Sequence, residues 1–291
     1  MATAAMATTQ AYEVIVIGGS FAGLSAAMQL ARARRRVCVV DAGQPRNRFA
    51  AASHGFFGQD GEPPLAMIEQ ARRKLAAYPT VGFVQGTVVS ATAQQRAGSP
   101  ENGFEVVLDD GATLEAHKLV LAFGVQDGLP EIAGLRERWG ASVLHCPYCH
   151  GYEFAGQRLG VLYHSAGSAM HAQLIADWGP TTLFLNGDTT LETAERERLL
   201  ALDITIEPAP IAALEGPGQV LQGVEVLEGV VRRVRAEAVA TQHRAARGHH
   251  RHHAVIWRVV FCFVLLNARP EQTEKCCGRG GVQSPRFRIT E

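Results

Sequence analysis

Two cysteines separated by two residues, Cys146 and Cys149, carry the most distinctive chemistry in this chain of 291 residues and six Cys. They lie in the segment His145-Cys-Pro-Tyr-Cys-His150. Two Cys at positions i and i+3 can close a small disulfide ring, and a helix start or a nearby His lowers a thiol pKa toward neutrality. His150 directly follows the second Cys and can protonate a leaving thiolate. The sequence therefore predicts that Cys146, Cys149 and His150 perform thiol–disulfide exchange.

Two other interpretations of the paired cysteines stay open. A zinc site requires two further ligands at suitable spacing, but the chain has no second C-x-x-C. His145 and His150 are too close in sequence to the cysteines to complete one tetrahedron. Alternatively, both Cys are buried and inert, and His150 is only a polar residue at a helix start. The residue types favour redox chemistry over both alternatives.

A second group of residues is suited to binding a phosphate. The run from Gly18 to Gly23 follows a β-branched segment, residues 12–17, and opens a stretch with helical apolar periodicity. A second apolar segment, residues 36–40, ends in Asp41. This order of strand, glycine turn, helix, strand and acid is typical of dinucleotide-binding domains. The predicted cofactor-binding residues are Gly18, Gly19, Ser20, Phe21, Ala22, Gly23, Asp41, Arg48 and Gly124.

Each predicted cofactor residue has a physical role. Gly18 permits the tight turn, Gly23 lets the helix approach the strand, and the first helical amides face a pyrophosphate. Asp41 can accept hydrogen bonds from an adenosine ribose. Ser20 replaces the usual second glycine, and an ordinary strand-to-helix turn is the alternative. Arg48 either covers the adenine–phosphate end or belongs to a solvated loop, and Gly124 ends an apolar strand where a sheet edge can pass a cofactor.

The elements around these residues indicate an α/β protein. Strands are expected at residues 81–85, 87–92, 104–108 and 118–121, and a helix at residues 63–77. Hydrophobic residues make up 47% of the chain, enough for about two packed domains.

Charge and hydropathy narrow the expected partners and location. Basic and acidic residues number 28 each, which gives no argument for nucleic-acid or membrane partners. The start lacks the features of a signal peptide, and the longest apolar stretch, residues 254–268, contains Arg258. We therefore expect a cytoplasmic protein.

Several motifs of this chain resemble the low-molecular-weight thioredoxin reductase-like flavoproteins, a class II branch of the FAD-dependent pyridine nucleotide-disulfide oxidoreductases. The resemblance covers roughly residues 12–225. It is carried by the sequences VIGGSFAGLSAA, PRNRFA, SHGF and HCPYCHGYE. These motifs are similar to a bacterial branch that is related to the dithiol oxidases of disulfide-containing natural products such as gliotoxin and holomycin.

The resemblance implies two Rossmann-like three-layer domains. Residues 1–124 would bind FAD, residues 125–234 would form an inserted NAD(P)-binding-like domain with the C-x-x-C, and residues 235–291 would be an atypical basic tail. Cys149 would lie against the flavin and Cys146 would exchange with the substrate. Typical members have Asp after the second Cys, where this chain has His150. A homodimer is implied, with a small dithiol or disulfide, or a thioredoxin-like protein, as substrate.

The second nucleotide-binding turn departs from the family pattern. The strand at residues 158–163 is followed by His164-Ser-Ala-Gly-Ser-Ala-Met170, which lacks the glycine fingerprint. After the next strand, residues 186–190 lack the Arg pair that would hold a 2′-phosphate. Whether NADPH or O₂ is the second redox partner therefore stays open.

The tail after Val234 departs further. The family's Gly-Asp motif is missing there, and Gly187-Asp188 lies in the wrong domain. The histidine-rich segment, residues 243–253, could bind metal, or the basic tail could bind a partner. The favoured interpretation is a non-homologous or frame-shifted end, which would leave the FAD site incomplete. The alternative function is then an impaired flavin- or nucleotide-binding module.

Overall fold

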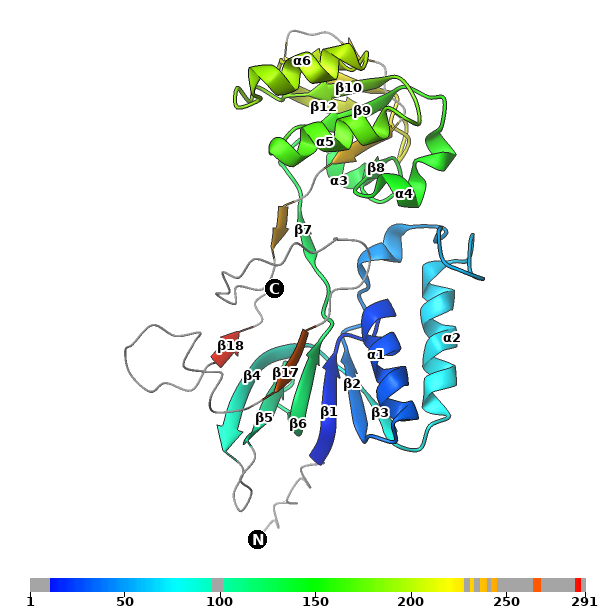
Figure 1. Cartoon of the computed structure of the whole chain (residues 1–291), viewed down its shortest axis with the longest axis vertical. Helices are drawn as coiled ribbons and strands as arrows, with labels where there is room; N and C mark the ends of the chain where they lie inside the picture. Colours follow the sequence, from blue (N-terminus) through cyan, green and yellow to red (C-terminus); the bar gives the residue numbers. More distant parts are fainter. Residues whose placement is uncertain are drawn as a thin grey trace, which may run out of the picture. The chain divides into compact units, whose positions relative to one another are not determined.

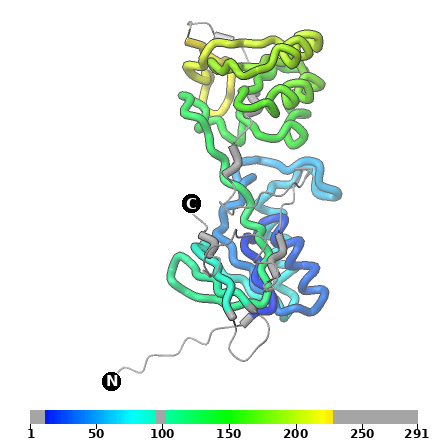
Figure 2. Tube along the Cα trace, turned by 60° about the vertical axis from the view of Figure 1, so that its left-hand side comes forward, coloured from blue at the N-terminus to red at the C-terminus, as the bar shows by residue number. Residues whose placement is uncertain are grey.

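The computed structural model describes residues 11–95, 102–227, 231–232, 236–239, 242–244, 264–267 and 286–288. The chain divides into two compact units, each described here by itself (Figures 1 and 2). The first unit draws on Met1–Arg46, Leu65–Gln126 and Arg244–Glu291, and the second on Asn47–Pro64 and Asp127–His243. Residues 245–253 of the histidine-rich segment and the Cys276–Cys277 pair of the tail lie outside the described residues.

The first unit is built on an eight-stranded sheet with the order β18-β4-β5-β6-β1-β2-β3, and β17 also pairs with β6. Helices α1 and α2 lie beside β1, β2 and β3 (Figure 1). The elements are β1 (Ala11–Ile17), α1 (Phe21–Arg32), β2 (Val37–Asp41), α2 (Pro64–Ala76), β3 (Val81–Gln85), β4 (Val88–Gln95), β5 (Asn102–Leu108), β6 (Thr113–Leu121), β17 (Val264–Asn267) and β18 (Arg286–Arg288).

Four strands of this sheet, β3, β2, β1 and β6, run parallel. Their carboxyl ends therefore meet at one edge, which is where ligands bind in open α/β sheets. The β2 residues Val37–Val40 are all buried because the sheet is covered on both faces. This register brings Gly18 next to the ends of β2 and β6.

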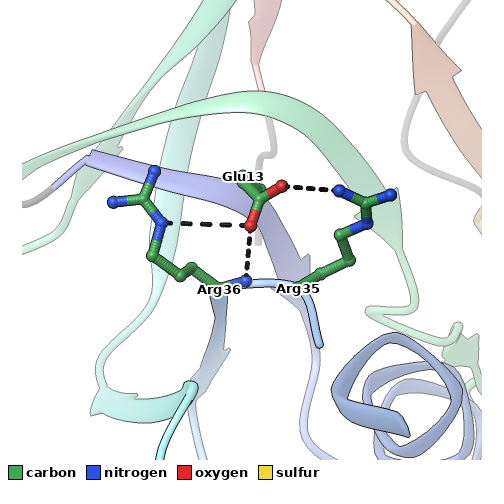
Figure 3. Close-up of polar contacts among 3 residues, drawn as sticks. All are labelled: Glu13, Arg35 and Arg36. Carbon is green, nitrogen blue, oxygen red and sulfur yellow. Dashed lines mark hydrogen bonds and ion pairs between the residues drawn. The ribbon is translucent and has the colours of Figure 1, made fainter. Parts of the chain in front are cut away.

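The opposite end of β1 is fixed by a small polar cluster around Glu13 (Figure 3). Its carboxylate accepts hydrogen bonds from the Arg36 backbone N–H at 2.9 Å and from Arg35 Nη1 at 3.1 Å. The Arg36 backbone hydrogen bond is the main reason that the pKa of Glu13 lies below its ordinary value. The cluster ties the start of β1 to the turn before β2.

The second unit contains a five-stranded parallel sheet, β11-β10-β9-β15-β8, and a three-stranded antiparallel sheet, β12-β13-β14. Its strands are β8 (Val143–Leu144), β9 (Leu159–Leu162), β10 (Thr181–Phe184), β11 (Thr205–Glu207), β12 (Ile211–Glu215), β13 (Gly223–Val226), β14 (Val231–Arg232) and β15 (Ala236–Val239). Its helices are α3 (Leu135–Arg138), α4 (Pro147–His150), α5 (Ala166–Ile175) and α6 (Thr193–Ala201). The short elements η1 (Arg46–Phe49), η2 (Tyr152–Phe154), and the paired β7 (Gln126–Gly128) and β16 (Gln242–Arg244) complete the fold.

The α/β fold class predicted from the sequence is confirmed, with parallel sheets of the Rossmann type. One strand is longer than expected: β6 begins at Thr113 because its first half pairs with β5, with Phe104 opposite Ala116. Residues 47–64 group with the second unit, although they fall within the stretch 1–124 that the sequence assigned to one domain. Within the described part of the chain, no helix has the length and apolarity to cross a membrane.

The core of the first unit holds a buried Cys38 thiol hydrogen-bonded to Tyr12. Burial raises the pKa of Cys38 from 9.0 to about 11 and that of Tyr12 to about 12. Between pH 9 and 11 the Cys38 thiol loses its proton in the unfolded chain but keeps it in the folded chain. The stabilisation is therefore complete below about pH 9 and is lost as the pH rises toward 11.

We expect the free energy of unfolding to fall more steeply between pH 9 and 11 in the wild type than in Cys38→Ala. The thiol accounts for a difference on the order of 2 kcal/mol over this range. Urea unfolding at fixed pH steps measures it. Equal slopes in the two proteins would contradict the assignment.

Candidate functional site

The predicted phosphate-binding turn connects β1 to α1 in the first unit. The Gly18 N–H donates to the Val40 carbonyl at 2.8 Å, and Gly18 has a φ of +105°. A Cβ at Gly18 would overlap the Ala122 carbonyl at the end of β6. A Cβ at Gly23 would overlap the Gly18 carbonyl and press on Val16. Both glycines are therefore required by the close approach of turn, helix and sheet.

The start of α1 has the features of an anion site. Ser20 is the N-cap residue, but its side chain makes no capping hydrogen bond, and the first turn has no acidic residue. The first N–H groups of an α-helix have no intrahelical acceptor. Together with the helix dipole they favour a phosphate.

Asp41 ends β2 beside this turn, and its carboxylate has two protein partners. Oδ1 accepts the Gly19 N–H at 3.1 Å, and Oδ2 lies 3.2 Å from Arg72 Nη1. The Arg72 guanidinium, from α2, also lies over the Phe83 ring at 4.8 Å. A carboxylate offers about four acceptor positions, so two remain for a ribose. Arg72 was missed by the sequence analysis, because nothing local links residue 72 to residue 41.

Two predicted cofactor residues lie outside this cluster of contacts. Gly124 follows β6 with a φ of +75°, and a Cβ there would meet open space. Arg48 belongs to η1, and its guanidinium lies 4.3 Å from the centre of the Phe49 ring. Its grouping with the second unit leaves the predicted contact with a cofactor untested.

In the second unit, the structure joins Cys146 and Cys149 in a disulfide with a Cα–Cα distance of 5.4 Å. Cys146 is the N-cap of α4, Pro147 is the first helical residue, and the Cys149 N–H donates to the Cys146 carbonyl at 3.3 Å. Proline suits this position because its fixed φ matches a helix and no amide donor is lost. The helix has a single turn, so its dipole is small. Among the described residues, no group of three or more potential ligands could hold a metal ion.

The surroundings of the disulfide are apolar on the inner side and aromatic on the outer side. A cavity of about 30 Å³ adjoins Cys146, lined mainly by apolar side chains such as Phe154, Ile175 and Trp178. Its volume corresponds to about one water molecule. Tyr148, between the two cysteines, is 67% exposed and meets the Trp178 ring edge-on.

His150 lies at the end of α4, directly after Cys149. Burial lowers the pKa of His150, nearby Glu153 opposes this shift, and nearby His54 adds to it. His150 is therefore largely neutral at pH 7 and can accept a proton from a thiol. His54 and Glu153 were not among the predicted site residues. Both residues lie in motifs that carry the resemblance, His54 in SHGF and Glu153 at the end of HCPYCHGYE, but neither motif indicated that the two side chains meet.

The second nucleotide-binding turn, between β9 and α5, is closed by its own serines. Ser165 and Ser168 form a capping box, in which each side chain accepts the other residue's backbone N–H. The fully buried Ser168 hydroxyl also accepts the His164 N–H at 3.1 Å. Of these amides, that of Ser168 belongs to the first helical turn, which is the part of a helix that faces a pyrophosphate. The open start of α1 and the capped start of α5 are thus chemically different.

The segment after β10, residues 186–190, contains the acidic Asp188 and no basic residue. Asp188 Oδ1 accepts the Thr190 N–H and hydroxyl, each at 2.6 Å, and these hydrogen bonds lower the pKa of Asp188. Its charge at neutral pH repels a phosphate. The Asn186 amide oxygen accepts the Ile211 N–H at 2.8 Å, so it supports β12.

A single family match covers both the glycine turn and the cysteine pair. The family model "Pyridine nucleotide-disulphide oxidoreductase" matches residues 12–162, just over half of the chain. The "Thioredoxin reductase tcpT" of Claviceps purpurea is 34% identical over 193 residues, which cover 64% of this chain and 59% of that protein. The chain spans less than two thirds of the length of the curated relatives it matches.

Solved structures of similar proteins agree with this match. An oxidoreductase from Agrobacterium tumefaciens is 43% identical with a TM-score of 0.72, covering 80% of this chain and 76% of that one. HlmI is 37% identical with a TM-score of 0.76, covering 81% and 74% respectively.

Proposed function

Because the chain belongs to the pyridine nucleotide-disulphide oxidoreductase family, we propose that it is a FAD-dependent thiol–disulfide oxidoreductase that uses Cys146 and Cys149 as its redox pair. The observation that carries this proposal is the disulfide between these two residues, placed directly before the half-buried His150. A structural disulfide would not require a proton acceptor at that position. A redox disulfide does, because thiolate is the attacking species.

The proposed exchange proceeds through a mixed disulfide between the substrate and Cys146. His150 takes a proton from one thiol of the dithiol substrate, and the thiolate attacks Cys146. The Cys146–Cys149 bond breaks, a mixed disulfide forms, and Cys149 leaves as a thiolate that His150 can protonate. The second substrate thiol then attacks the mixed disulfide and releases Cys146 as a thiol. The substrate has lost two electrons and two protons, which the reduced cysteine pair now holds.

The first nucleotide-binding turn fits FAD. The uncapped start of α1, the glycine turn at Gly18 to Gly23 and the remaining acceptor positions of Asp41 suit its pyrophosphate and ribose. When bound, FAD supplies a two-electron carrier for the cysteine pair. Cys149 is the proposed flavin-side sulfur and Cys146 the exchanging sulfur.

The second turn does not fit NADPH. The Ser165–Ser168 capping box engages the N-cap and N3 amides at the start of α5, and residues 186–190 include Asp188 but no Arg that could bind a 2′-phosphate. We therefore propose O₂ as the terminal acceptor. The overall reaction is then dithiol plus O₂ to disulfide plus H₂O₂.

Flavin absorption and two electron-transfer assays on the purified chain test this proposal. We expect flavin bands that bleach with dithiothreitol, and peroxide release driven by dithiothreitol. NADPH-driven disulfide reduction should be at least about tenfold slower than peroxide release, because residues 186–190 supply no Arg to bind the 2′-phosphate. NADPH-driven disulfide reduction that is faster than dithiothreitol-driven peroxide release would reverse the proposed direction of electron flow. Folded protein without flavin would instead support an impaired nucleotide-binding module.

Substrate, assembly and location are further parts of the proposal. Two substrates suit the exposed side of the cysteine turn: the dithiol form of a small cyclic disulfide, and a thioredoxin-like protein. Parallel assays with each substrate distinguish them. We propose a homodimer, which light scattering on the purified protein measures. We also propose a cytoplasmic location.

A further inference from the structure

The Asp41 carboxylate lies where β2 ends, against the glycine turn of the first unit. The Asp41 carbonyl accepts the Gly86 N–H at 3.1 Å, which fixes the backbone at this position to the end of β3. A Cβ on Gly19 would lie only 2.7 Å from Asp41 Cγ, so the turn and the side chain are in direct contact. Gly19 immediately precedes Ser20, the N-cap of α1. The carboxylate therefore adjoins the predicted phosphate site at the start of this helix.

Two donors from different elements hold the two oxygens of this carboxylate. Arg72 Nη1, from α2, donates to Asp41 Oδ2 at 3.2 Å, and the Gly19 N–H donates to Oδ1 at 3.1 Å. Any rotation of the carboxylate group away from this orientation breaks at least one of these hydrogen bonds. The side chains of Asp41 and Arg72 are only 16% and 29% exposed. Solvent and salt therefore screen this ion pair less than a pair on the surface.

The Arg72 guanidinium is itself supported by an aromatic ring. Its Cζ lies 4.8 Å from the centre of the Phe83 ring, within the range of a cation–π contact. Phe83, in β3, packs against a core cluster that includes Val39 of β2 and Leu75 of α2. The ring therefore restricts the guanidinium, and the guanidinium restricts the carboxylate.

A carboxylate held in this way is preorganised for a hydroxyl donor. Arg72 and Gly19 use one acceptor position on each oxygen of Asp41, so one position on each oxygen stays available. An acidic residue at the end of this strand accepts a hydrogen bond from the ribose 2′-hydroxyl in dinucleotide-binding domains. A carboxylate that is already ordered costs less to immobilise when the ligand binds. The positive charge of Arg72 also offsets the repulsion between Asp41 and a pyrophosphate.

We propose that Arg72 is a positioning residue of the nucleotide site: stacked on Phe83, it holds the Asp41 carboxylate in the orientation that accepts the adenosine ribose hydroxyl of FAD. This inference rests on the proposed function, because it concerns the cofactor of that reaction. Arg72 acts through Asp41 and does not itself contact the nucleotide in this account.

Calorimetric titration of ADP and 2′-deoxy-ADP into the full chain, freed of flavin, tests the inference without turnover. ADP carries the adenosine ribose and two phosphates, and 2′-deoxy-ADP lacks only the hydroxyl that Asp41 would bind. We expect the wild type to bind ADP about tenfold more tightly, the effect of one hydrogen bond to a charged group. In Arg72→Gln, the affinity for ADP should fall about tenfold and that for 2′-deoxy-ADP only about twofold, which nearly removes the preference.

The preference for ADP, rather than affinity alone, decides between positioning and other roles. Equal weakening of both nucleotides in Arg72→Gln would overturn the inference, because a lost charge or a damaged fold affects them alike. An unchanged preference with unchanged affinity would overturn it as well. A wild type that binds FAD and ADP but does not distinguish the two nucleotides would refute the role of Asp41 at the ribose and, with it, that of Arg72. A wild type that binds neither FAD nor ADP would instead refute the proposed function.

Two further variants separate orientation from charge and from damage to α2. Arg73→Gln makes the same exchange one residue later, where the arginine is 65% exposed and pairs with Glu69 of its own helix, also at 3.2 Å. We expect it to bind both nucleotides as the wild type does. Arg72→Lys keeps the positive charge but lacks the rigid planar donors and the stacking on Phe83, so its preference should fall to about threefold. A full wild-type preference in Arg72→Lys would show that charge alone suffices, and this variant decides the question even if Arg72→Gln does not fold.

A double-mutant cycle shows whether Arg72 acts through Asp41. Asp41→Asn should itself remove most of the preference for ADP, because the charged acceptor is lost. In that background, Arg72→Gln should change the affinity for ADP by less than about twofold, against about tenfold in the wild type. A tenfold loss in both backgrounds would show that Arg72 acts on the nucleotide independently of Asp41 and would overturn the inference.

Discussion

Cys149→Ser is expected to abolish turnover of a dithiol, with a loss of at least about 10³-fold, because the ring can no longer close to store two electrons. The remaining Cys146 thiol still attacks a disulfide substrate. Without Cys149 to resolve it, the mixed disulfide accumulates. Mass spectrometry of the digested protein after incubation with a small disulfide should therefore show an adduct on the peptide that contains Cys146.

The reciprocal variant and a core cysteine provide the controls for this experiment. Cys146→Ser should lose turnover equally, but should form far less adduct, because the exchanging sulfur is missing. Cys38→Ala should keep turnover, since its thiol is fully buried in the first unit. Equal adduct formation by Cys146→Ser and Cys149→Ser would contradict the assigned roles of the two sulfurs.

Gly18→Ala is expected to cause a large loss of stability and of flavin binding. The new Cβ would overlap the Ala122 carbonyl, and backbone atoms cannot move aside as a flexible side chain can. The φ of +105° adds a conformational cost for any L side chain. Together these effects correspond to about 3 kcal/mol or more of unfolding free energy.

Gly111→Ala separates the two contributions. Gly111 also has a positive φ, +83°, but a Cβ there would meet nothing within 4 Å. We expect it to cost only about 1 kcal/mol and to leave flavin content unchanged. Urea unfolding and the flavin-to-protein absorbance ratio measure both effects. Similar losses in the two variants would show that steric crowding at the turn is unimportant.

The main elements could be predicted because each depends on neighbours in the sequence. The β-branched run at residues 12–17, the glycine turn and the apolar period after it define β1 and α1 through local backbone preferences. The pair Cys146 and Cys149 can close a ring whatever surrounds it, since the two residues are three apart. The chain's place in its family followed from the same two segments.

The electrostatic partners of these segments could not be predicted in this way. Arg72 reaches Asp41 only because α2 packs near the end of β2, and His54 reaches Glu153 across almost a hundred positions of the chain. Sequence periodicity reports which side of an element is buried but not which polar residue it faces. The turn before α5 could be predicted only in part. The sequence showed that the glycine fingerprint is missing there, but it did not predict the hydrogen bonds of the Ser165–Ser168 capping box.

By itself, the sequence determined the fold class, the family, the phosphate turn and the reactive cysteine pair, because these arise from residues within a few positions of one another. The tertiary structure alone decided which charges surround His150, which amides stay open to an anion, and which carboxylate oxygens are already engaged. The physical reason is that hydrogen bonds and ion pairs act over about 3–4 Å, a distance that only packing of remote segments can set.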